Sequence, residues 1–336
     1  MIILTGTYPP ERCGVGDYTR HLLSTPTGGK WHLLYLKNWR IKDLRGNIAQ
    51  LSECKDSELN IQYPTMGYRT SLMPHLLAIY AVLFLHKKLY ITVHEYSQLG
   101  WKGKLALNFL FLFAKDVIFT TSFERDCAHR HNPWMHKGKV IKIRSNIPSS
   151  PICKPMQERK WDVGYFGYIR PLKGIEDFIP VAEQLANQGK RVYIMGQTQP
   201  EFLSYYKPLL QKFEKIGITY MGNKSQTEVA DTLADTKIMF LPYPDGLSER
   251  RGSFLAAVVN GAAVVSTKGK FTSKEQKERF TLIEPDRAYE VIESYLKDFT
   301  SLRKQQENSL AYATQCVPES WQQIAKEYEL CMRGNI

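Results

Sequence analysis

The stretch WDVGYFGYIRPLKGIEDFIPVAEQLAN, residues 161–187, contains the pattern that decides the fold. Its first part is a short apolar run that predicts a strand over 161–167. Its last part repeats apolar residues at helical spacing over 174–187, and Gly189 stands where such a helix ends. A strand, a short loop and an amphipathic helix form the repeating unit of a doubly wound α/β domain.

The same alternation extends along the chain in both directions. The predicted strands are 1–5, 31–36, 58–63, 89–93, 117–121, 139–143, 161–167, 191–195, 218–221, 237–243, 262–266 and 281–283. Helical patterns separate most of these strands. The sequence therefore predicts an α/β fold with two doubly wound, Rossmann-like domains, in which ligands bind at the carboxyl ends of the strands.

The boundary between the domains is predicted at 145–160. The segment SNIPSSPICKPMQERK holds three prolines and three serines without periodicity, which is typical of a linker. A helical region over 301–332 is interrupted near Pro318, and its last helix has an apolar face. That face consists of Trp321, Ile324, Ala325 and Tyr328. The expected domains are 1–150 and 151–316, followed by a C-terminal helix over 317–336.

Composition and charge exclude several classes of protein. The 336 residues carry a net charge of +12, with 43% hydrophobic and 23% charged residues, as in a globular protein. Residues 1–150 hold 20 basic residues, 10 acidic residues and all eight histidines. No run reaches the roughly 18 apolar residues of a membrane span, and the start lacks the features of a signal peptide. The six cysteines form no CxxC pair, so we expect reduced thiols and a cytoplasmic location rather than disulfides or a zinc site.

Two apolar stretches of the basic first part, 72–85 and 105–114, indicate contact with a membrane surface. Each is too short to span a bilayer, and an ordinary core helix is the alternative. The aromatic and lysine side chains concerned are Trp101, Phe109, Phe111, Phe113, Lys87, Lys88, Lys102, Lys104 and Lys115. We expect this part to bind an anionic membrane surface peripherally. Nucleic acid is not an expected partner, because no binding module and no interleaving of aromatic and basic residues is present.

One loop after a predicted strand has the residues of an anion site. Arg170 and Lys173 lie next to the start of the 174–187 helix. The free N–H groups at a helix start favour negative charge, and the two cations add to that effect. The alternative is a pair of solvated surface cations.

A second loop, PDGLSERRGS over residues 244–253, joins a buried strand to a short helix that is apolar on all sides. We expect Ser253 to cap this helix. Gly252 allows a ligand to approach the backbone, and Arg250 and Arg251 add positive charge. The alternative is an ordinary connection with a good helix cap.

The first part of the chain has weaker signals. His94 and Glu95 follow the 89–93 strand, at the ligand edge of the sheet, although a lone histidine more often belongs to the core. Gly14 and Gly16 follow the first strand without the third glycine of a dinucleotide site. The chain has neither a Walker A sequence nor an Asp-x-Asp pair for a metal-held nucleotide. Three histidines are expected in a solvated basic loop rather than in a metal site: His129, His131 and His136.

Several motifs occur in a specific order along nearly the whole chain. They are YPP (8–10), GVGDY (14–18), QYP (62–64), VHEYS (93–97), FGYIRPLKG (166–174), YMGN (220–223), LPYPDGLSERRGSFLAAVVNGAAVVST (241–267) and SWQQIAKEYEL (320–330). Together they resemble the group 1 (family 4) retaining glycosyltransferases with the GT-B fold. The resemblance implies two Rossmann-like domains that face a cleft, and a C-terminal helix that crosses back to the first domain.

The resemblance also implies roles for individual residues. A nucleotide-sugar donor binds mainly to the second domain, and a saccharide or lipid-linked acceptor binds mainly to the first. Arg170 and Lys173 match the cations that hold the donor diphosphate, and His94 matches a histidine near the transferred sugar. The other donor-side positions are Gly14, Gly16, Gly167, Asn223, Ser248, Glu249, Arg251, Gly252 and Ser253. The acceptor-side positions are Asp17, Gln62, Tyr63 and Glu95. Gly14 and Gly16 are expected in a loop that closes over the donor. No cofactor and no metal are expected, because fixed cations neutralise the departing diphosphate.

The chain departs from the family at two positions. Much of the family has two glutamates eight positions apart in the second domain, where Ser248 and Ala256 stand here, and Glu249 lies one position away. The sequence therefore does not identify the sugar or the nucleotide base of the donor. The expected activity is retaining, metal-independent transfer in the assembly of cell-surface polysaccharide or glycolipid. The alternatives are a nucleotide-sugar epimerase of the same fold, an inactive homologue that binds sugar nucleotides, and a basic nucleic-acid-binding protein.

Overall fold

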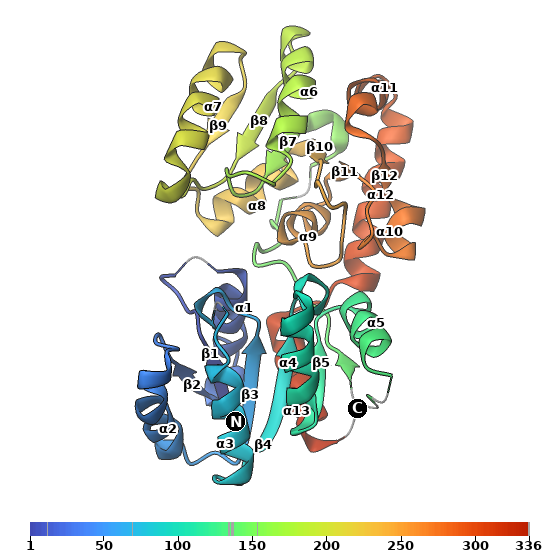
Figure 1. The fold of residues 1–336 in the computed structure, drawn as a ribbon. Coiled ribbons are helices and arrows are strands. Elements are labelled where there is room, and N and C mark those ends of the chain that lie inside the picture. Colours follow the sequence, from blue (N-terminus) through green and yellow to red (C-terminus); the bar gives the residue numbers. More distant parts are fainter. Residues whose placement is uncertain (12, 69, 134, 136–137, 153, 335–336) are drawn as a thin grey trace. The chain divides into compact units, whose positions relative to one another are not determined.

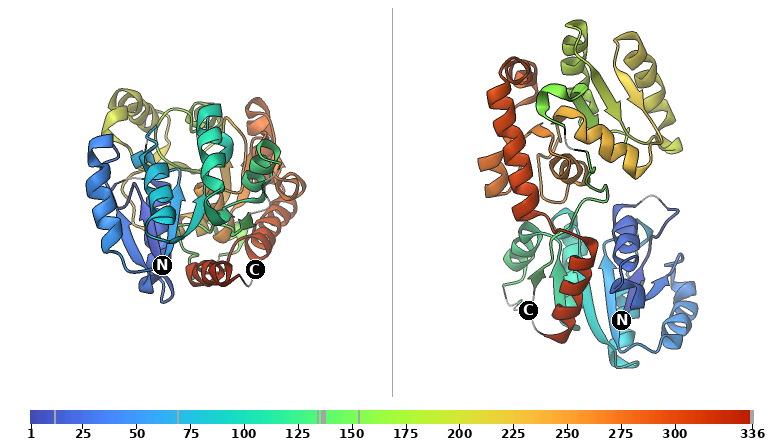
Figure 2. Two further views of the ribbon diagram at one scale, coloured as in Figure 1. Left: turned by 60° about the horizontal axis from the view of Figure 1, so that its bottom comes forward. Right: turned by 180° about the vertical axis from the view of Figure 1, so that it is seen from behind.

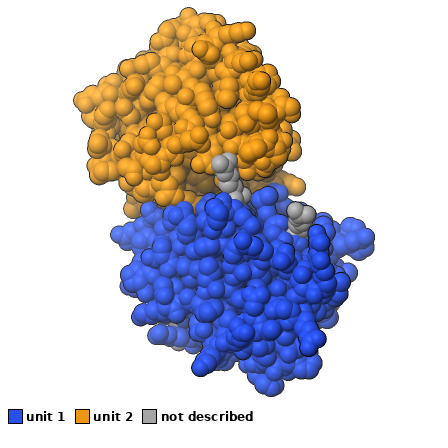
Figure 3. Space-filling view, turned by 90° about the vertical axis from the view of Figure 1, so that its left-hand side faces the viewer, with its two compact units in different colours: residues 1–144, 318–336 blue, residues 145–317 orange. Residues whose placement is uncertain are grey.

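The computed structural model describes residues 1–11, 13–68, 70–133, 135, 138–152 and 154–334. These residues form two compact units, one of residues 1–144 and 318–336 and one of residues 145–317 (Figure 3). Each unit is built on a parallel sheet of six strands. All twelve predicted strands are present, with ends that differ from the prediction by up to three residues. The α/β class with two doubly wound sheets is therefore confirmed.

The first unit has the strand order β2-β1-β3-β4-β5-β6. Its strands are β1 (Ile2–Thr5), β2 (His32–Tyr35), β3 (Glu58–Tyr63), β4 (Lys88–Val93), β5 (Ala114–Phe119) and β6 (Lys139–Val140). Its helices are α1 (Gly14–Leu23), α2 (Leu44–Glu53), α3 (Met73–Leu83), α4 (Trp101–Phe111), α5 (Ser122–His131) and α13 (Trp321–Arg333). The order reverses between β1 and β3, the kind of position at which doubly wound sheets bind ligands.

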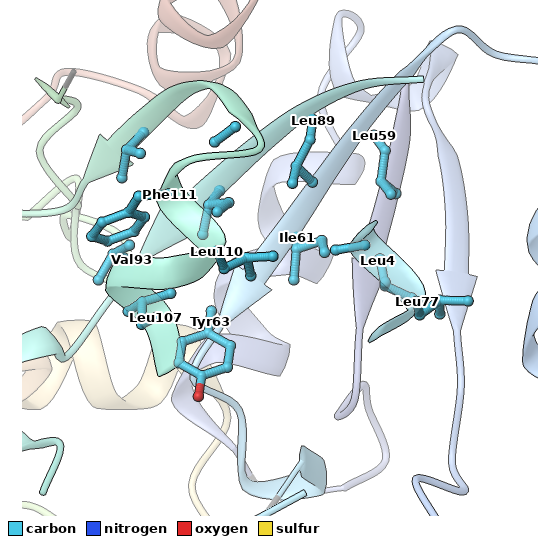
Figure 4. Packing of buried hydrophobic residues seen from close by; sticks show 14 of the residues in the cluster. Leu4, Leu59, Ile61, Tyr63, Leu77, Leu89, Val93, Leu107, Leu110 and Phe111 are labelled. Carbon is cyan, nitrogen blue, oxygen red and sulfur yellow. The ribbon is translucent and has the colours of Figure 1, made fainter. Parts of the chain in front are cut away.

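Helices cover both faces of this sheet. Leu77 of α3 and Leu107 of α4 pack on the strand residues Leu4, Ile61 and Val93 in one buried cluster (Figure 4). Helices α1 and α13 share a second buried cluster, and α13 crosses the opposite face of the sheet (Figure 2, right). A strand that is buried on both sides is rich in apolar residues, which explains the apolar runs of the sequence.

The C-terminal helix α13 belongs to the first unit. The Tyr328 hydroxyl lies 3.0 Å from the Tyr18 hydroxyl of α1 and 3.0 Å from Thr92 Oγ1 of β4. All three groups are buried. A buried hydroxyl without a partner is costly, so these bonds fix the position of the helix on the sheet in addition to its apolar contacts.

The second unit has the strand order β12-β11-β10-β7-β8-β9. Its strands are β7 (Trp161–Phe166), β8 (Val192–Met195), β9 (Thr219–Met221), β10 (Thr236–Leu241), β11 (Ala263–Ser266) and β12 (Thr281–Leu282). Its helices are α6 (Ile175–Asn187), α7 (Leu203–Lys215), α8 (Gln226–Ala234), α9 (Gly252–Val259), α10 (Lys274–Arg279), α11 (Ala288–Lys297) and α12 (Phe299–Cys316). The strand order reverses between β7 and β10, which are neighbours in the sheet.

The prediction of a linker over 145–160 is wrong for much of this segment. Arg159 is completely buried, and its guanidinium donates to the carbonyl oxygens of Thr236 at 2.8 Å and Gly261 at 2.9 Å. The Ser150 backbone N–H donates to Asn260 Oδ1 at 2.7 Å. Prolines and serines without periodicity exclude a helix or a strand, but they do not exclude tertiary contacts.

The two apolar stretches of the first unit form the helices α3 and α4, with the segments beside them. Phe111 and Lys87, which the sequence placed at a membrane surface, are buried, and the Lys87 ammonium donates to the carbonyl oxygens of Cys54 and Asp56. Among the residues that the structure describes, none of the helices has both the length and the apolar character needed to cross a membrane.

Candidate functional site

Two loops of the second unit meet where the strand order reverses. Residues 167–174 follow β7 and residues 242–251 follow β10. Gly174 has φ +80°, and a Cβ atom at this position would lie 1.8 Å from the Pro242 carbonyl oxygen. Only glycine allows both this backbone conformation and this approach. Ligands of doubly wound sheets bind at this kind of reversal, at the carboxyl ends of the strands.

The first of these loops holds a cation with a free donor. Arg170 is half-buried, and its Nε–H group is buried without a hydrogen-bond partner among the described residues. The loop backbone is fixed, since the Tyr165 hydroxyl donates to the Lys173 carbonyl oxygen at 2.9 Å. Helix α6 follows directly, and its N-cap Gly174 has no side chain to cap the first N–H groups. Both features favour an anion at this loop.

The second loop contradicts the predicted cap. Helix α9 begins at Gly252, its N-cap is Arg251, and no side chain of the described residues caps it. The Ser253 hydroxyl instead lies 2.6 Å from the Tyr243 hydroxyl. Gly252 is exposed, and a Cβ atom built on it would meet nothing within 4 Å. The start of α9 is therefore open to a ligand.

Arg250 and Arg251 are both held by Asp245, which the sequence analysis missed. The Arg251 guanidinium hydrogen-bonds to Asp245 Oδ1, and Arg250 Nη2 lies 3.6 Å from Asp245 Oδ2. Arg251 also lies over the Tyr243 ring, 4.6 Å from its centroid. One carboxylate offsets about half of the charge of two guanidinium groups, so the loop has a smaller positive charge than the arginine pair alone predicts. The motif PYPDG contained this signal, because an aspartate close in the sequence can reach both cations.

Two more donor-side positions, Ser248 and Glu249, and the second departure from the family, Ala256, have different surroundings. Ser248 is buried, and its hydroxyl oxygen has no partner among the described residues. Burial raises the pKa of Tyr312 on α12, and the nearby Glu249 carboxylate raises it further. Ala256 is completely buried inside the second unit, on helix α9. The protein thus has no acidic side chain at the Ser248 and Ala256 positions, and Glu249 interacts with a different element.

Gly167 and Asn223 also lie at carboxyl ends of strands. The Gly167 N–H donates to the Met195 carbonyl oxygen at 3.0 Å, directly after β7. Asn223 is exposed with φ +52° after β9. Because β8 lies between β7 and β9, the sheet does not bring Asn223 next to Arg170.

In the first unit, His94 follows β4 and belongs to a buried polar network. Its Nε2 atom lies 2.9 Å from Gln62 Oε1, and Gln62 Nε2 donates to Asn60 Oδ1 at 2.6 Å. Thr92 also donates to Asn60 Oδ1, at 3.1 Å, and links this network to Tyr328 of α13. Burial lowers the pKa of His94 to about 3, so the imidazole is neutral and its Nε2–H group donates to Gln62.

The other acceptor-side residues surround this network only in part. Tyr63 ends β3 and is buried, and Asp17 lies in α1 with its carboxylate 3.7 Å from Arg20. Burial raises the pKa of Asp17. Glu95 is exposed. The structure therefore brings Gln62 and His94 into contact, whereas Glu95 faces solvent.

Gly14 and Gly16 were predicted in a loop, and this prediction is wrong. Both lie in the first turn of α1. A Cβ atom on Gly16 would lie 3.1 Å from the Thr7 carbonyl oxygen, so glycine lets the helix start pack closely on the end of β1. Gly14 has open space around it, because a Cβ atom there would meet nothing within 4 Å.

Sequence reasoning missed two threonines at the reversal of the first sheet. Thr7 and Thr65 follow β1 and β3, and the side-chain oxygen of each is buried without a partner among the described residues. A Cβ atom on Gly6 would lie 2.7 Å from Thr65 Oγ1, so the two loops meet closely. Single threonines at strand ends have no sequence signature, and only the sheet order reveals them.

The basic segment near the end of the first unit is partly helical. His129 and His131 lie in the last turn of α5, where a loop was predicted, and His136 lies outside the described residues. The His131 Nδ1 atom lies 2.8 Å from the Cys127 carbonyl oxygen. Within the described ranges, no group of three histidine, cysteine, aspartate or glutamate residues is suited to hold a metal ion.

Buried histidines make the stability of the first unit depend on pH. His75 is buried on α3, and neither ring nitrogen has a partner among the described residues. Burial lowers its pKa from 6.5 to about 4. The unfolded chain therefore binds the proton first, and stability decreases as the pH falls from 6.5 toward 4. We expect His75 and His94 to remove about 2 kcal/mol each between neutral pH and about pH 5.

The variant His75→Leu tests this expectation, since it removes no hydrogen bond of the described structure. Urea unfolding of the full chain near neutral pH and near pH 5 should show a pH-dependent loss that is about 2 kcal/mol smaller than in the wild type. An unchanged loss would mean that His75 does not titrate differently in the folded and unfolded states.

Solved structures with the same architecture cover nearly the whole chain. HepE from Anabaena in complex with UDP has a TM-score of 0.76 at 14% identity, and the match covers 99% of both chains. Sucrose-phosphate synthase from Thermosynechococcus elongatus has a TM-score of 0.72 at 13% identity, over 99% of this chain and 98% of that chain. A glycosyltransferase from Rickettsia africae has a TM-score of 0.71 at 11% identity, over 99% and 98%. No protein-family model and no curated sequence matches the chain.

The chain therefore has the GT-B fold, the two-domain fold of these glycosyltransferases. The fold that the motifs predicted is confirmed. HepE has also been solved with UDP-glucose, at 14% identity to this chain and a TM-score of 0.72. At these identities the likeness is one of fold, and a shared fold does not by itself define the chemistry of a site.

Proposed function

We propose that the protein transfers a sugar from a nucleotide-sugar donor, with retention, to a saccharide or lipid-linked acceptor. The observation that carries this proposal is the pair of loops at the strand reversal of the second unit. There the Arg170 Nε–H group, which has no partner among the described residues, lies in the loop before α6. The second loop leads to the start of α9, where no described side chain acts as a cap. A diphosphate is an anion that suits such a set of donors.

In the proposed reaction, the bond between the sugar C1 and the terminal phosphate oxygen breaks while C1 bonds to the acceptor oxygen. The acceptor proton passes to the departing phosphate on the same face of the sugar, so no side chain needs to be a strong base. Arg170 and Lys173 stabilise the negative charge that develops on the diphosphate, without a requirement for a metal ion. The neutral His94 contributes a hydrogen-bonding group near the transferred sugar rather than a cation.

The acceptor and the cellular setting are parts of the same proposal. We assign the acceptor to the first unit. The protein would act in the assembly of cell-surface polysaccharide or glycolipid, at the inner face of the cell membrane. The excess of basic residues in 1–150 supports an anionic membrane surface as a partner. Uridine nucleotides are the first donors to test, because the structures of HepE contain UDP and UDP-glucose.

Binding of UDP or a UDP-sugar should raise the melting temperature of the full chain. Ligand at about 100 times its Kd stabilises a protein by about 2.7 kcal/mol. A panel of other nucleoside diphosphates serves as the specificity control, and release of free UDP with a glycosylated product separates transfer from epimerisation. No shift with any nucleotide would contradict the proposal.

The variant Gly252→Val locates this binding. Because a Cβ atom at Gly252 meets nothing within 4 Å, the folded chain should tolerate the larger side chain, with a change of less than about 1 kcal/mol in stability. A donor phosphate at the start of α9 would collide with the valine, so the UDP-induced shift should disappear. A variant that keeps the wild-type shift would place the ligand away from α9.

A further inference from the structure

Helices α3 and α4 of the first unit lie side by side and pack on each other (Figure 1). Their inner sides belong to the buried core, yet their outer sides are also apolar. We call this outer surface the α3–α4 face. Its members are Leu76, Leu83, Trp101, Leu105, Phe109 and Leu112.

The α3–α4 face breaks the usual pattern of a helix on the surface of a globular domain. The four residues from Trp101 to Leu112 follow each other at intervals of four, four and three positions, which places them on one side of α4. Their exposed fractions range from 53% to 72%. By comparison, α6 exposes Glu176, Gln184 and Asn187 on its outer side. Several exposed apolar side chains on two packed helices indicate a binding surface.

Charge identifies the kind of partner. Residues 70–115 contain five lysines and one acidic residue, Glu95. Lys88, Lys102 and Lys115 are exposed, and the Lys102 ammonium lies 5.5 Å from the centroid of the Trp101 ring. A second copy of the chain, packed by the same face, would bring a second Lys102 into a two-fold interface. An anionic lipid surface instead takes up the apolar side chains and attracts the cations.

We infer that the α3–α4 face holds the first unit on an anionic lipid bilayer, with Trp101, Leu105 and Phe109 in the headgroup region. The inference rests on the proposed function only for the choice of a membrane as partner. Phe111 and Lys87, which the sequence analysis expected at the membrane, do not belong to this face, because both are buried. Binding to lipid needs no donor and no turnover.

Flotation of the full chain with lipid vesicles tests the inference. We expect binding to vesicles of phosphatidylglycerol and phosphatidylcholine, and much weaker binding to phosphatidylcholine alone. Removal of each lysine near the surface should weaken binding about fivefold. Added salt should also weaken it, because the Debye length falls to about 8 Å near physiological ionic strength.

The variant Leu105→Glu with Phe109→Glu should reduce the vesicle-bound fraction at least about tenfold. The control is Leu203→Glu, which places one of these two charges on an exposed leucine of α7 in the second unit and should bind like the wild type. Both proteins should keep the UDP-induced thermal shift, which also shows that they are folded.

Three outcomes would overturn the inference. The first is a wild-type protein that stays in the soluble fraction with anionic vesicles at low salt. The second is a Leu105, Phe109 double variant that floats as well as the wild type. The third is a dimer in solution that the double variant dissociates, with no difference in flotation, because that result assigns the face to a second copy. A failed thermal shift with normal flotation would instead contradict the proposed function alone.

Discussion

Replacing Arg170 by alanine should lower kcat/KM by about 10²- to 10³-fold, the usual loss when one preorganised donor to a developing anion is removed. The Arg170 Nε–H group is buried without a partner among the described residues, so no bond of the described structure at that atom is lost. Lys173→Ala should have a similar effect, since both residues belong to the loop before α6. Steady-state kinetics with the donor identified by thermal shift provides the measurement.

A control separates this electrostatic role from a structural one. Arg170→Lys keeps the charge but not the planar guanidinium, and should recover only part of the lost activity. The melting temperature without ligand should change little in all three variants, whereas the UDP-induced shift should shrink. Activity near the wild-type level in both alanine variants would remove these residues from the donor site.

Gly174→Ala should both destabilise the second unit and abolish donor binding. The backbone at Gly174 has φ +80°, and the new Cβ atom would lie 1.8 Å from the Pro242 carbonyl oxygen. The loop must therefore change its backbone conformation and move away from the loop after β10. We expect a loss of more than about 3 kcal/mol in the free energy of unfolding, at the upper end for single substitutions.

Gly189→Ala is the matched control. Gly189 also has a positive φ, +74°, but a Cβ atom there would meet nothing within 4 Å. Its substitution should cost only the conformational strain, about 1–2 kcal/mol, and should leave UDP binding intact. Urea unfolding and thermal shifts of both variants provide the comparison. Equal losses would mean that the contact with Pro242 carries no part of the effect.

The sequence predicted the strands well because most strands of these sheets are short, rich in apolar residues and bounded by turn residues. The GT-B fold followed from the order of the motifs. Predictions failed where an outcome depended on residues distant in the sequence. Arg159 looked like part of a linker, but it is buried against carbonyl oxygens of Thr236 and Gly261, which are 77 and 102 positions away.

Predictions about the site failed for a related reason. Ser253 has the right chemistry and position for a helix cap, but the Tyr243 hydroxyl binds it instead. Arg250 and Arg251 were correctly recognised as cations, whereas their common partner Asp245 appeared only in the folded loop. Local propensity identifies which groups a residue can bind, and tertiary packing decides which of them it does bind.

The position of α13 has a consequence for the order in which the chain is made. The first unit draws its last helix from residues that follow the whole second unit. While a ribosome adds the roughly 190 residues after Arg144, which takes about 10–40 s at 5–20 residues per second, Tyr18, Leu22 and Thr92 wait without the helix that buries them. The continuous second unit can be completed in that interval. The first unit therefore begins to emerge first but completes its fold last. Until α13 has emerged, the face of the sheet that this helix covers stays accessible to chaperones.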